Sequence, residues 1–246
     1  MKIGSEIKFL KNLPSTNSYA AVLLKNSAVA DGTIIYTNFQ SAGRGQTGNS
    51  WESEDGKNLL ISIILYPSMI EPADQFLISM AVSLGITGFL DRHIQGSAIK
   101  WPNDIYVKSD KIAGILIENT LIGNKIENSV AGIGLNINQT SFVSNAPNPV
   151  SLSQITGIQY NLEECLIQLS DEIDRRYQQL VNSDLNSLRA DYISRIFRKD
   201  EWCEWRDESG VFTGRIVTVS ADGRLIIEKA GGKRALYAFK EIEFII

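Results

Sequence analysis

The 246-residue sequence contains one histidine and two cysteines, so it has few of the side chains used in nucleophilic catalysis or metal binding. A Ser–His–Asp triad or a multi-histidine metal site would depend on His93 alone, and the segment around it, FLDRHIQG, is typical of a helix end. Cys165 and Cys203 lie far apart in the chain and suggest neither a metal clip nor a disulfide framework. Reduced cysteines are typical of the cytosol. We therefore expect a cytoplasmic protein without histidine-based catalysis.

The chain also lacks a strong net charge and a long hydrophobic run. Its formal net charge of −4 gives no overall attraction to nucleic acid or to an anionic membrane. The most apolar run, Leu59 to Tyr66, is too short to cross a bilayer, and the first residues lack the apolar core of a secretory signal. With 43% hydrophobic residues, the chain is long enough for one large domain and a small second one. We expect neither a nucleic-acid partner nor a membrane.

Hydrophobic spacing predicts a mixed α and β organisation in the first 200 residues. A capped helix is expected at 14–28, a long helix with an apolar stripe through Phe76 and Met80 at 71–93, and two more helices at 161–181 and 185–197. Asn161 and Glu164 are placed to form a capping box. Strands are expected at 32–40, 58–66, 98–107, 111–118 and 126–136.

The composition changes after residue 198. From Trp202 the chain consists of short β-type runs joined by glycine-containing turns, which predicts a small β-barrel of about five strands. We therefore expect a domain at 1–197 and a small SH3-like barrel at 198–246.

The segment QSAGRGQTGNSW contains a G-x-G-x-x-G pattern at Gly43, Gly45 and Gly48. A dinucleotide-binding fingerprint requires a helix after the glycines, but here a second strand follows, and the spacing also differs from a P-loop. What remains is a flexible strand-to-strand loop carrying Arg44, whose backbone N–H groups and guanidinium suit a phosphate or a carboxylate. Taken alone, the loop is more typical of an ordinary hairpin connection.

Two later segments favour a ligand site. KWPNDIYVKSDKIAGILIEN has Lys100 and Lys111 at the ends of successive strands, where both ammonium groups can reach one pocket. AGIGLNIN reads as a strand with little side-chain bulk, so that a ligand can approach its backbone closely. Asn136 lies in this run, where asparagine is not ordinarily favoured.

Together these segments resemble the biotin–protein ligases, also called biotin–[acetyl-CoA-carboxylase] ligases. The resemblance rests on STN at Ser15–Asn17, QSAGRGQTGNSW, KWPNDIYVKSDKIAGILIE and GIGLNIN, in the family's order and spacing, and on the small C-terminal domain. It implies an α+β fold, with a mixed β-sheet flanked by helices as in class II aminoacyl-tRNA synthetases. It further implies an enzyme that makes biotinyl-5′-AMP from biotin and Mg·ATP and transfers biotin to a lysine of a biotin carboxyl carrier domain. Members that also act as repressors carry a DNA-binding domain ahead of STN, so we expect no repressor function here.

The resemblance also implies roles for individual residues. Lys111 would bridge the biotin carboxylate and the α-phosphate, with Arg44 and the loop closing over this junction. The expected biotin-binding residues are Ser15, Thr16, Asn17, Gln40, Gly43, Arg44, Gly45, Gln46, Lys111, Gly114 and Gly132. The expected ATP-binding residues are Trp51, Lys100, Asn103, Asn136 and Gln46. Asp104 is a weak candidate for Mg²⁺.

The loop departs from the commoner family pattern, because Gln46, Thr47 and Asn49 stand where many members have further arginines. We therefore expect the adenylate to be held less tightly than in an arginine-rich relative. Two other functions stay open: a lipoate or other acyl-adenylate ligase, and a non-catalytic biotin-binding module. The sequence also leaves open whether the chain forms a homodimer.

Overall fold

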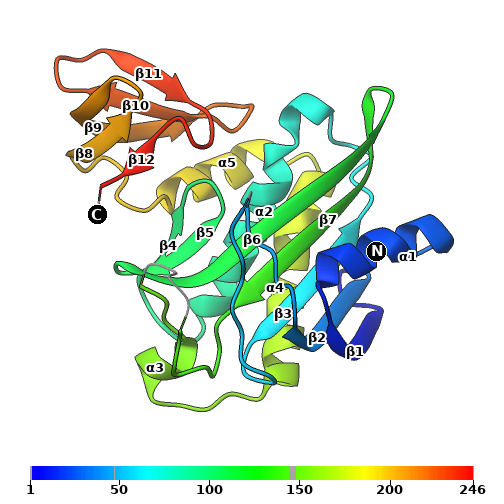
Figure 1. Cartoon of the computed structure of the whole chain (residues 1–246). Coiled ribbons are helices and arrows are strands. Elements are labelled where there is room, and N and C mark those ends of the chain that lie inside the picture. Colours follow the sequence, from blue (N-terminus) through cyan, green and yellow to red (C-terminus); the bar gives the residue numbers. More distant parts are fainter. Residues whose placement is uncertain (1, 47, 144–147, 246) are drawn as a thin grey trace.

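The structure, a computed structural model, describes residues 2–46, 48–143 and 148–245 and is built around a seven-stranded mixed sheet (Figure 1). The strands of this sheet are β1 (Ile7–Leu13), β2 (Ile34–Gln40), β3 (Leu59–Leu65), β4 (Ser97–Lys100), β5 (Asp104–Val107), β6 (Asp110–Ile122) and β7 (Lys125–Leu135). Their order is β1-β2-β3-β7-β6-β5-β4. Only the pairing of β1 with β2 is parallel.

Helices cover both faces of this sheet because the strands are apolar on both sides. In β2, Ile34 belongs to a core cluster with residues of helices α2 (Phe76–Leu90) and α4 (Leu162–Val181), whereas the neighbouring Ile35 packs with Ala20 of α1 (Thr16–Asn26). Successive side chains of a strand point to opposite faces, so the continuous apolar runs of β2 and β3 predict this burial. The remaining helices are α3 (Leu152–Thr156), α5 (Leu185–Ser194) and the 3₁₀ turn η1 (Pro72–Asp74).

Helix α2 is buried on nearly all sides, not along a single stripe as the sequence suggested. It lies between the sheet and α4, and Gly85 allows the close approach, because a Cβ there would come within 2.6 Å of the Ile173 backbone. The segment Pro72–Leu90 is long and apolar enough to cross a membrane, but 67% of it is buried inside the protein. Its composition therefore fits a core helix.

Three elements differ from the sequence prediction. Strand β1 was not expected; it is an edge strand of mostly exposed or half-exposed residues with the sequence IKFLKNL. The segment 98–107 forms two strands, β4 and β5, because the cis Trp101–Pro102 peptide and Asn103 make the turn of a hairpin. The short helix α3 was also not expected, and a capping box between Ser151 and Gln154 starts it. In α4 Asn161 does cap the helix, accepting from the backbone N–H groups of residues 163 and 164.

The C-terminal residues form a separate antiparallel sheet of five strands, as predicted. These are β8 (Cys203–Asp207), β9 (Gly210–Val219), β10 (Leu225–Lys229), β11 (Arg234–Tyr237) and β12 (Glu243–Phe244), in the order β11-β10-β9-β8-β12. Figure 1 shows this C-terminal lobe beside the β4–β5 end of the large sheet. The expected boundary at residue 198 falls between α5 and β8.

Candidate functional site

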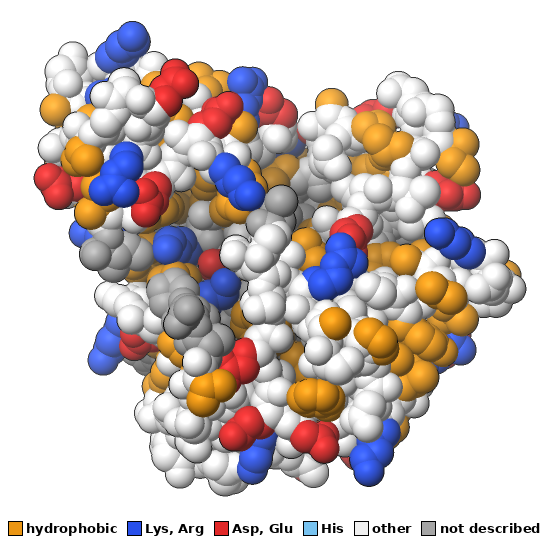
Figure 2. Space-filling model, in the orientation of Figure 1, with side chains coloured by type: hydrophobic (Ala, Val, Ile, Leu, Met, Phe, Trp, Pro, Cys, Tyr) orange, Lys and Arg blue, Asp and Glu red, His pale blue; other side chains and the backbone are white. Residues whose placement is uncertain are grey.

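A cavity of about 600 Å³ opens between the large sheet, the glycine loop and the C-terminal lobe. Its floor is formed by β6 and β7, and one wall is the loop between Gln40 and Trp51. The opposite wall comes from the β4–β5 turn and from the lobe. In Figure 2, basic and acidic side chains lie together where the lobe meets the larger domain. The cavity therefore joins segments from the beginning, middle and end of the chain.

Glycines keep the floor of the cavity flat. A Cβ at Gly134 would overlap the indole ring of Trp51, and one at Gly114 would lie 2.9 Å from the same ring. A Cβ at Gly132 would overlap the side-chain amide of Asn17. The low bulk of the GIGLNIN segment thus has a physical reason, because two side chains lie directly on the strand backbones.

Neutral polar groups gather at one end of the cavity, at the N-terminus of α1. The backbone N–H of Thr16 donates to Gln40 Oε1 over 2.7 Å, and the Thr16 hydroxyl lies 3.1 Å from the same oxygen. Ser62 on β3 lies 2.7 Å from the Thr16 hydroxyl and donates to Asn17 Oδ1 over 2.6 Å. Ser15, Thr16, Asn17 and Ser62 are all buried. This cluster suits a small uncharged polar group that must be hydrogen-bonded once it is buried.

Positive charge gathers at the other end. Lys111 Nζ lies 2.7 Å from Asp104 Oδ1, and both side chains are only about one-fifth exposed, at 22% and 21%. This contact is an ion pair but not a well-aligned hydrogen bond, because the buried Asp104 Oδ1 has no hydrogen-bond partner among the described residues. Lys111 also lies 5.7 Å from the centre of the Trp51 ring. A cation in such a setting is available to an incoming anion.

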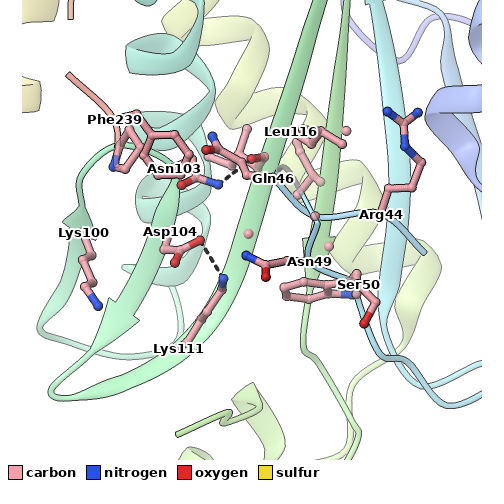
Figure 3. A pocket seen from close by; sticks show the side chains of 18 of the residues that line it. Arg44, Gln46, Asn49, Ser50, Lys100, Asn103, Asp104, Lys111, Leu116 and Phe239 are labelled. Atoms are coloured by element: carbon pink, nitrogen blue, oxygen red, sulfur yellow. Dashed lines mark hydrogen bonds and ion pairs between the residues drawn. The ribbon is translucent and has the colours of Figure 1, made fainter. Parts of the chain in front are cut away.

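Lys100 points away from Lys111 in Figure 3. Its ammonium lies 3.1 Å from the Tyr106 hydroxyl and 5.2 Å from the centre of the Phe244 ring of β12. Burial lowers the pKa of Lys100. The negative charge of Asp104 raises this pKa in part, and the positive charge of Lys111 lowers it further. Burial also raises the pKa of Tyr106 to about 12. The C-terminal lobe therefore helps to set the environment of a cavity lysine.

Arg44 does not converge on Lys111 in this structure, although both line the cavity. Its guanidinium pairs with Glu118 on β6, with distances of 2.6 and 3.3 Å to the two carboxylate oxygens. In Figure 3 it points away from Lys111, whereas Asn49 of the same loop lies on the Lys111 side. The loop thus presents a neutral amide to the cation end.

Most of the residues expected from the sequence line this cavity, and two do not. Those that do are Ser15, Thr16, Asn17, Gln40, Arg44, Gly45, Gln46, Trp51, Lys100, Asn103, Asp104, Lys111, Gly114 and Gly132. Gly43 lies outside the lining, where its carbonyl accepts from the Trp51 N–H and closes the loop hairpin. Asn136 is buried with its amide nitrogen 3.1 Å from the Val150 carbonyl oxygen. Thr47 lies outside the described residues.

Sequence reasoning missed two groups of residues at the cavity. The first group belongs to the C-terminal lobe and consists of Arg206, Phe239, Ile242, Glu243, Phe244 and Ile245. No local pattern marks them, because their position depends on how the lobe docks. The second group is Ser62 and Glu118, which bind the expected residues. Glu118 ends the quoted KIAGILIE motif, so the motif itself was the available signal.

Among residues 2–46, 48–143 and 148–245, no cluster of three or more histidine, cysteine, aspartate or glutamate side chains could hold a metal ion. Asp104, the candidate for Mg²⁺, is engaged by Lys111. The described residues therefore do not fit a metal site built by protein ligands alone.

The fold and the cavity together define a class of protein: a mixed-sheet domain whose cavity suits an anionic small molecule with a neutral polar part, completed by a small β lobe. The chain is matched over residues 9–136 by the Biotin/lipoate A/B protein ligase family and over residues 203–242 by the Biotin protein ligase C terminal domain. It belongs to the Biotin/lipoate A/B protein ligase family and carries the C-terminal domain of its biotin protein ligases.

Individual relatives agree with this assignment. The chain is 27% identical over 237 residues to the biotin–[acetyl-CoA-carboxylase] ligase of Paracoccus denitrificans, covering 92% of this chain and 97% of that protein. It is 26% identical over 242 residues to the bifunctional ligase/repressor BirA of Bacillus spizizenii, covering 96% and 73%. The biotin protein ligase of Aquifex aeolicus, solved in complex with biotin and ATP, superimposes with a TM-score of 0.81 at 24% identity, covering 97% of this chain and 98% of that one.

Proposed function

We propose that this chain is an ATP-dependent biotin–protein ligase. It joins the carboxylate of biotin to the α-phosphate of ATP, which gives biotinyl-5′-AMP and pyrophosphate. It then transfers the biotinyl group to a lysine of a biotin carboxyl carrier domain and releases AMP. The relatives support biotin and ATP as the substrates.

One observation carries this proposal: a single cavity has a neutral hydrogen-bonding end and a cationic end. The cluster around Thr16, Asn17 and Gln40 suits the ureido ring of biotin, which is uncharged and polar. The other end holds Lys111 and Lys100, which suits a carboxylate next to phosphates. The glycine floor between them leaves room for the bicyclic ring and its tail.

The chemistry of the first step needs position and positive charge, not a nucleophilic side chain. A carboxylate oxygen of biotin forms a bond to the α-phosphorus as the bond from that phosphorus to the β-bridging oxygen breaks, and the electron pair leaves with pyrophosphate. Negative charge from both reactants meets at this junction, so a fixed cation stabilises the transition state. Lys111 takes this role by exchanging Asp104 for the ligand oxygens. The scarcity of histidine therefore does not weaken the proposal.

The nucleotide occupies the cationic side of the cavity in this proposal. Trp51 provides an aromatic face, and Lys100, Asn103 and Gln46 line the same side. Asn103 is held in place because its amide nitrogen donates to the Ile115 carbonyl over 2.9 Å. Magnesium would arrive bound to the ATP phosphates, since Mg²⁺ usually keeps several waters and few protein ligands.

The second step requires a neutral lysine amine on the carrier, which attacks the biotinyl carbonyl and expels AMP. Asp104 is the candidate to take the amine proton, because it lies at the cationic end beside Lys111. The C-terminal lobe forms the outer wall of the cavity and so contributes to the surface that meets the carrier.

Pyrophosphate–ATP exchange tests the first step directly. We expect exchange with biotin and none with lipoate, and a fall of about 10²- to 10³-fold in Lys111→Ala, the size of loss typical when one stabilising charge is removed. Lys125→Ala, an exposed lysine of β7, is the control and should exchange at the wild-type rate. Exchange with lipoate in place of biotin would favour the lipoate branch of the family. Biotin binding without exchange would favour a non-catalytic binding module.

A further inference from the structure

The ammonium group of Lys100 is held by aromatic side chains and not by a carboxylate. It donates to the Tyr106 hydroxyl over 3.1 Å, and it lies 4.7 Å from the centre of the Tyr106 ring and 5.2 Å from the centre of the Phe244 ring. Among the described residues, no carboxylate lies within ion-pair distance of this ammonium. An aromatic face attracts a cation through its quadrupole. Lys100 is therefore held between a strand of the large sheet and the C-terminal lobe.

This kind of support leaves Lys100 able to bind an anion. A carboxylate partner carries a full negative charge that would repel a phosphate, whereas an aromatic ring carries none. An ammonium group has three hydrogen-bond donors, and the Tyr106 hydroxyl accepts from one of them. Since Lys100 lines the cavity, its remaining donors are available to a ligand there.

Phe244 is itself held by the core of the C-terminal lobe. It lies on β12 opposite Trp205 of β8, and the centres of the two rings are 4.1 Å apart. Trp205 is fully buried. Phe197, between α5 and β8, has its ring centre 6.3 Å from that of Phe244 and 5.4 Å from that of Tyr106. A row of aromatic rings thus runs from the core of the lobe to the lysine and the large sheet.

We propose that Phe244 is a positioning residue of the nucleotide site: together with Tyr106 it holds the Lys100 ammonium where it meets the phosphates of ATP, so that this cation is in place only when the C-terminal lobe is docked. The inference rests on the proposed function, in which the phosphates lie at the cationic end of the cavity. A lysine side chain has a flexible four-carbon stem, and a ring on either side of its ammonium group restricts that freedom before the ligand arrives. Loss of the Phe244 ring should therefore weaken the binding of ATP and leave the binding of biotin unchanged.

Substitutions of Phe244 separate its attraction for a cation from its packing. Phe244→Leu removes the ring, and Phe244→Tyr keeps it. Fluorinated phenylalanines incorporated at position 244 keep the shape of the ring, but each added fluorine withdraws π-electron density and so weakens the attraction for a cation.

Phe212 provides the matched control. It belongs to the same lobe, and its ring centre lies 3.9 Å from the ammonium of Lys229. Neither Phe212 nor Lys229 lines the cavity. Phe212→Leu therefore removes the same kind of contact from the lobe without touching the site. Thermal melting establishes that each variant is folded before KM values are compared.

We expect Phe244→Leu to raise the KM for ATP in biotin-dependent pyrophosphate exchange about 3- to 20-fold, the range for one cation–π contact, with the KM for biotin unchanged. Phe244→Tyr should keep both KM values close to those of the wild type. In the fluorinated series the KM for ATP should rise with each fluorine at position 244, whereas the same series at position 212 should leave it unchanged.

A double-variant cycle tests whether Phe244 acts through Lys100. Lys100→Met should raise the KM for ATP. In that background Phe244→Leu should add nothing, because the ring then has no cation to hold.

The outcomes distinguish this inference from the proposed function. If the wild type neither exchanges with biotin nor binds biotin and ATP in calorimetry, the proposed function fails and this inference with it. If the wild type exchanges but Phe244→Leu keeps the wild-type KM for ATP, Phe244 does not position Lys100. A KM for ATP that stays constant across the fluorinated series at position 244 would show that the ring acts by packing alone. Independent, additive effects of Lys100→Met and Phe244→Leu would equally overturn the inference while the ligase activity stands.

Discussion

The indole nitrogen of Trp101 donates a hydrogen bond of 2.8 Å to the carbonyl oxygen of Gly223, and this buried contact joins the large domain to the C-terminal lobe. Trp101 lies in the β4–β5 turn between Lys100 and Asn103, which both line the cavity. A Cβ at Gly223 would also lie 2.6 Å from the Phe76 ring, so the lobe approaches the domain closely at this point. The position of the lobe and the shape of the cavity are therefore coupled.

Trp101→Phe should uncouple the position of the C-terminal lobe from the shape of the cavity. The change leaves the buried Gly223 carbonyl without its donor, so we expect the free energy of unfolding to fall by about 1–3 kcal/mol. We also expect the KM for ATP to rise more than the KM for biotin, because the lobe borders the cationic end. Denaturant unfolding and exchange kinetics measure the two effects. Trp202→Phe, at a half-exposed indole, is the control; equal losses in both variants would contradict the specific role of Trp101.

Gly134→Ala should displace the Trp51 ring from the cavity floor, since the added methyl group overlaps the ring. We expect biotin and ATP affinities to fall about 10-fold or more, as for an overpacked site that costs about 1–3 kcal/mol. Adding Trp51→Ala removes the overlap, so the double variant should be no less stable than Trp51→Ala alone. If the losses of unfolding free energy in the two single variants simply add up in the double variant, Trp51 does not rest on Gly134.

Helices and strands could largely be predicted where their own residues show a cap, a regular apolar spacing or a turn. The helix α4 has an asparagine cap and apolar residues every three or four positions, and the C-terminal strands are separated by glycine turns. Strand β1 could not be predicted in this way, because its mixture of lysines and apolar residues, IKFLKNL, has no regular two-residue period. It becomes a strand through its pairing with β2.

The motifs in the sequence pointed to residues that line one cavity, but not to the contacts those residues make. Lys111 and Asp104 come together because β5 and β6 are paired, whereas the sequence indicated only that Lys100 and Lys111 could reach one pocket. The partner of Arg44 depends on how a loop lies over β6, and no spacing rule contains that information. Phe244 reaches Lys100 only through docking of the lobe. Tertiary packing, not local propensity, decides such contacts.

The free energy of unfolding should depend on pH through Lys100. Burial lowers the pKa of this lysine below its ordinary value of 10.5, so the folded state releases the proton before the unfolded state does. Between the folded-state pKa and 10.5 the unfolded state binds more protons, and stability therefore rises with pH in this window. Lys100→Met should lack this rise, whereas Lys125→Met should keep it. Denaturant unfolding between pH 8 and 10.5 measures the difference between the variants; parallel curves for wild type and Lys100→Met would contradict the prediction.

Gln46→Arg should slow the release of the adenylate. Gln46 lines the cavity, and the described loop residues carry one charge, on Arg44, which is engaged by Glu118. A new guanidinium within reach of the phosphate contributes about 1.5–3 kcal/mol, which corresponds to a release rate about 10- to 150-fold lower. Release is measured by forming labelled biotinyl-5′-AMP on the enzyme, removing free substrate and following the label in solution. Gln95→Arg, at an exposed position away from the cavity, controls for the added charge. Equal release from wild type and Gln46→Arg would contradict the prediction, because the neutral loop would then hold the adenylate as well as a charged one.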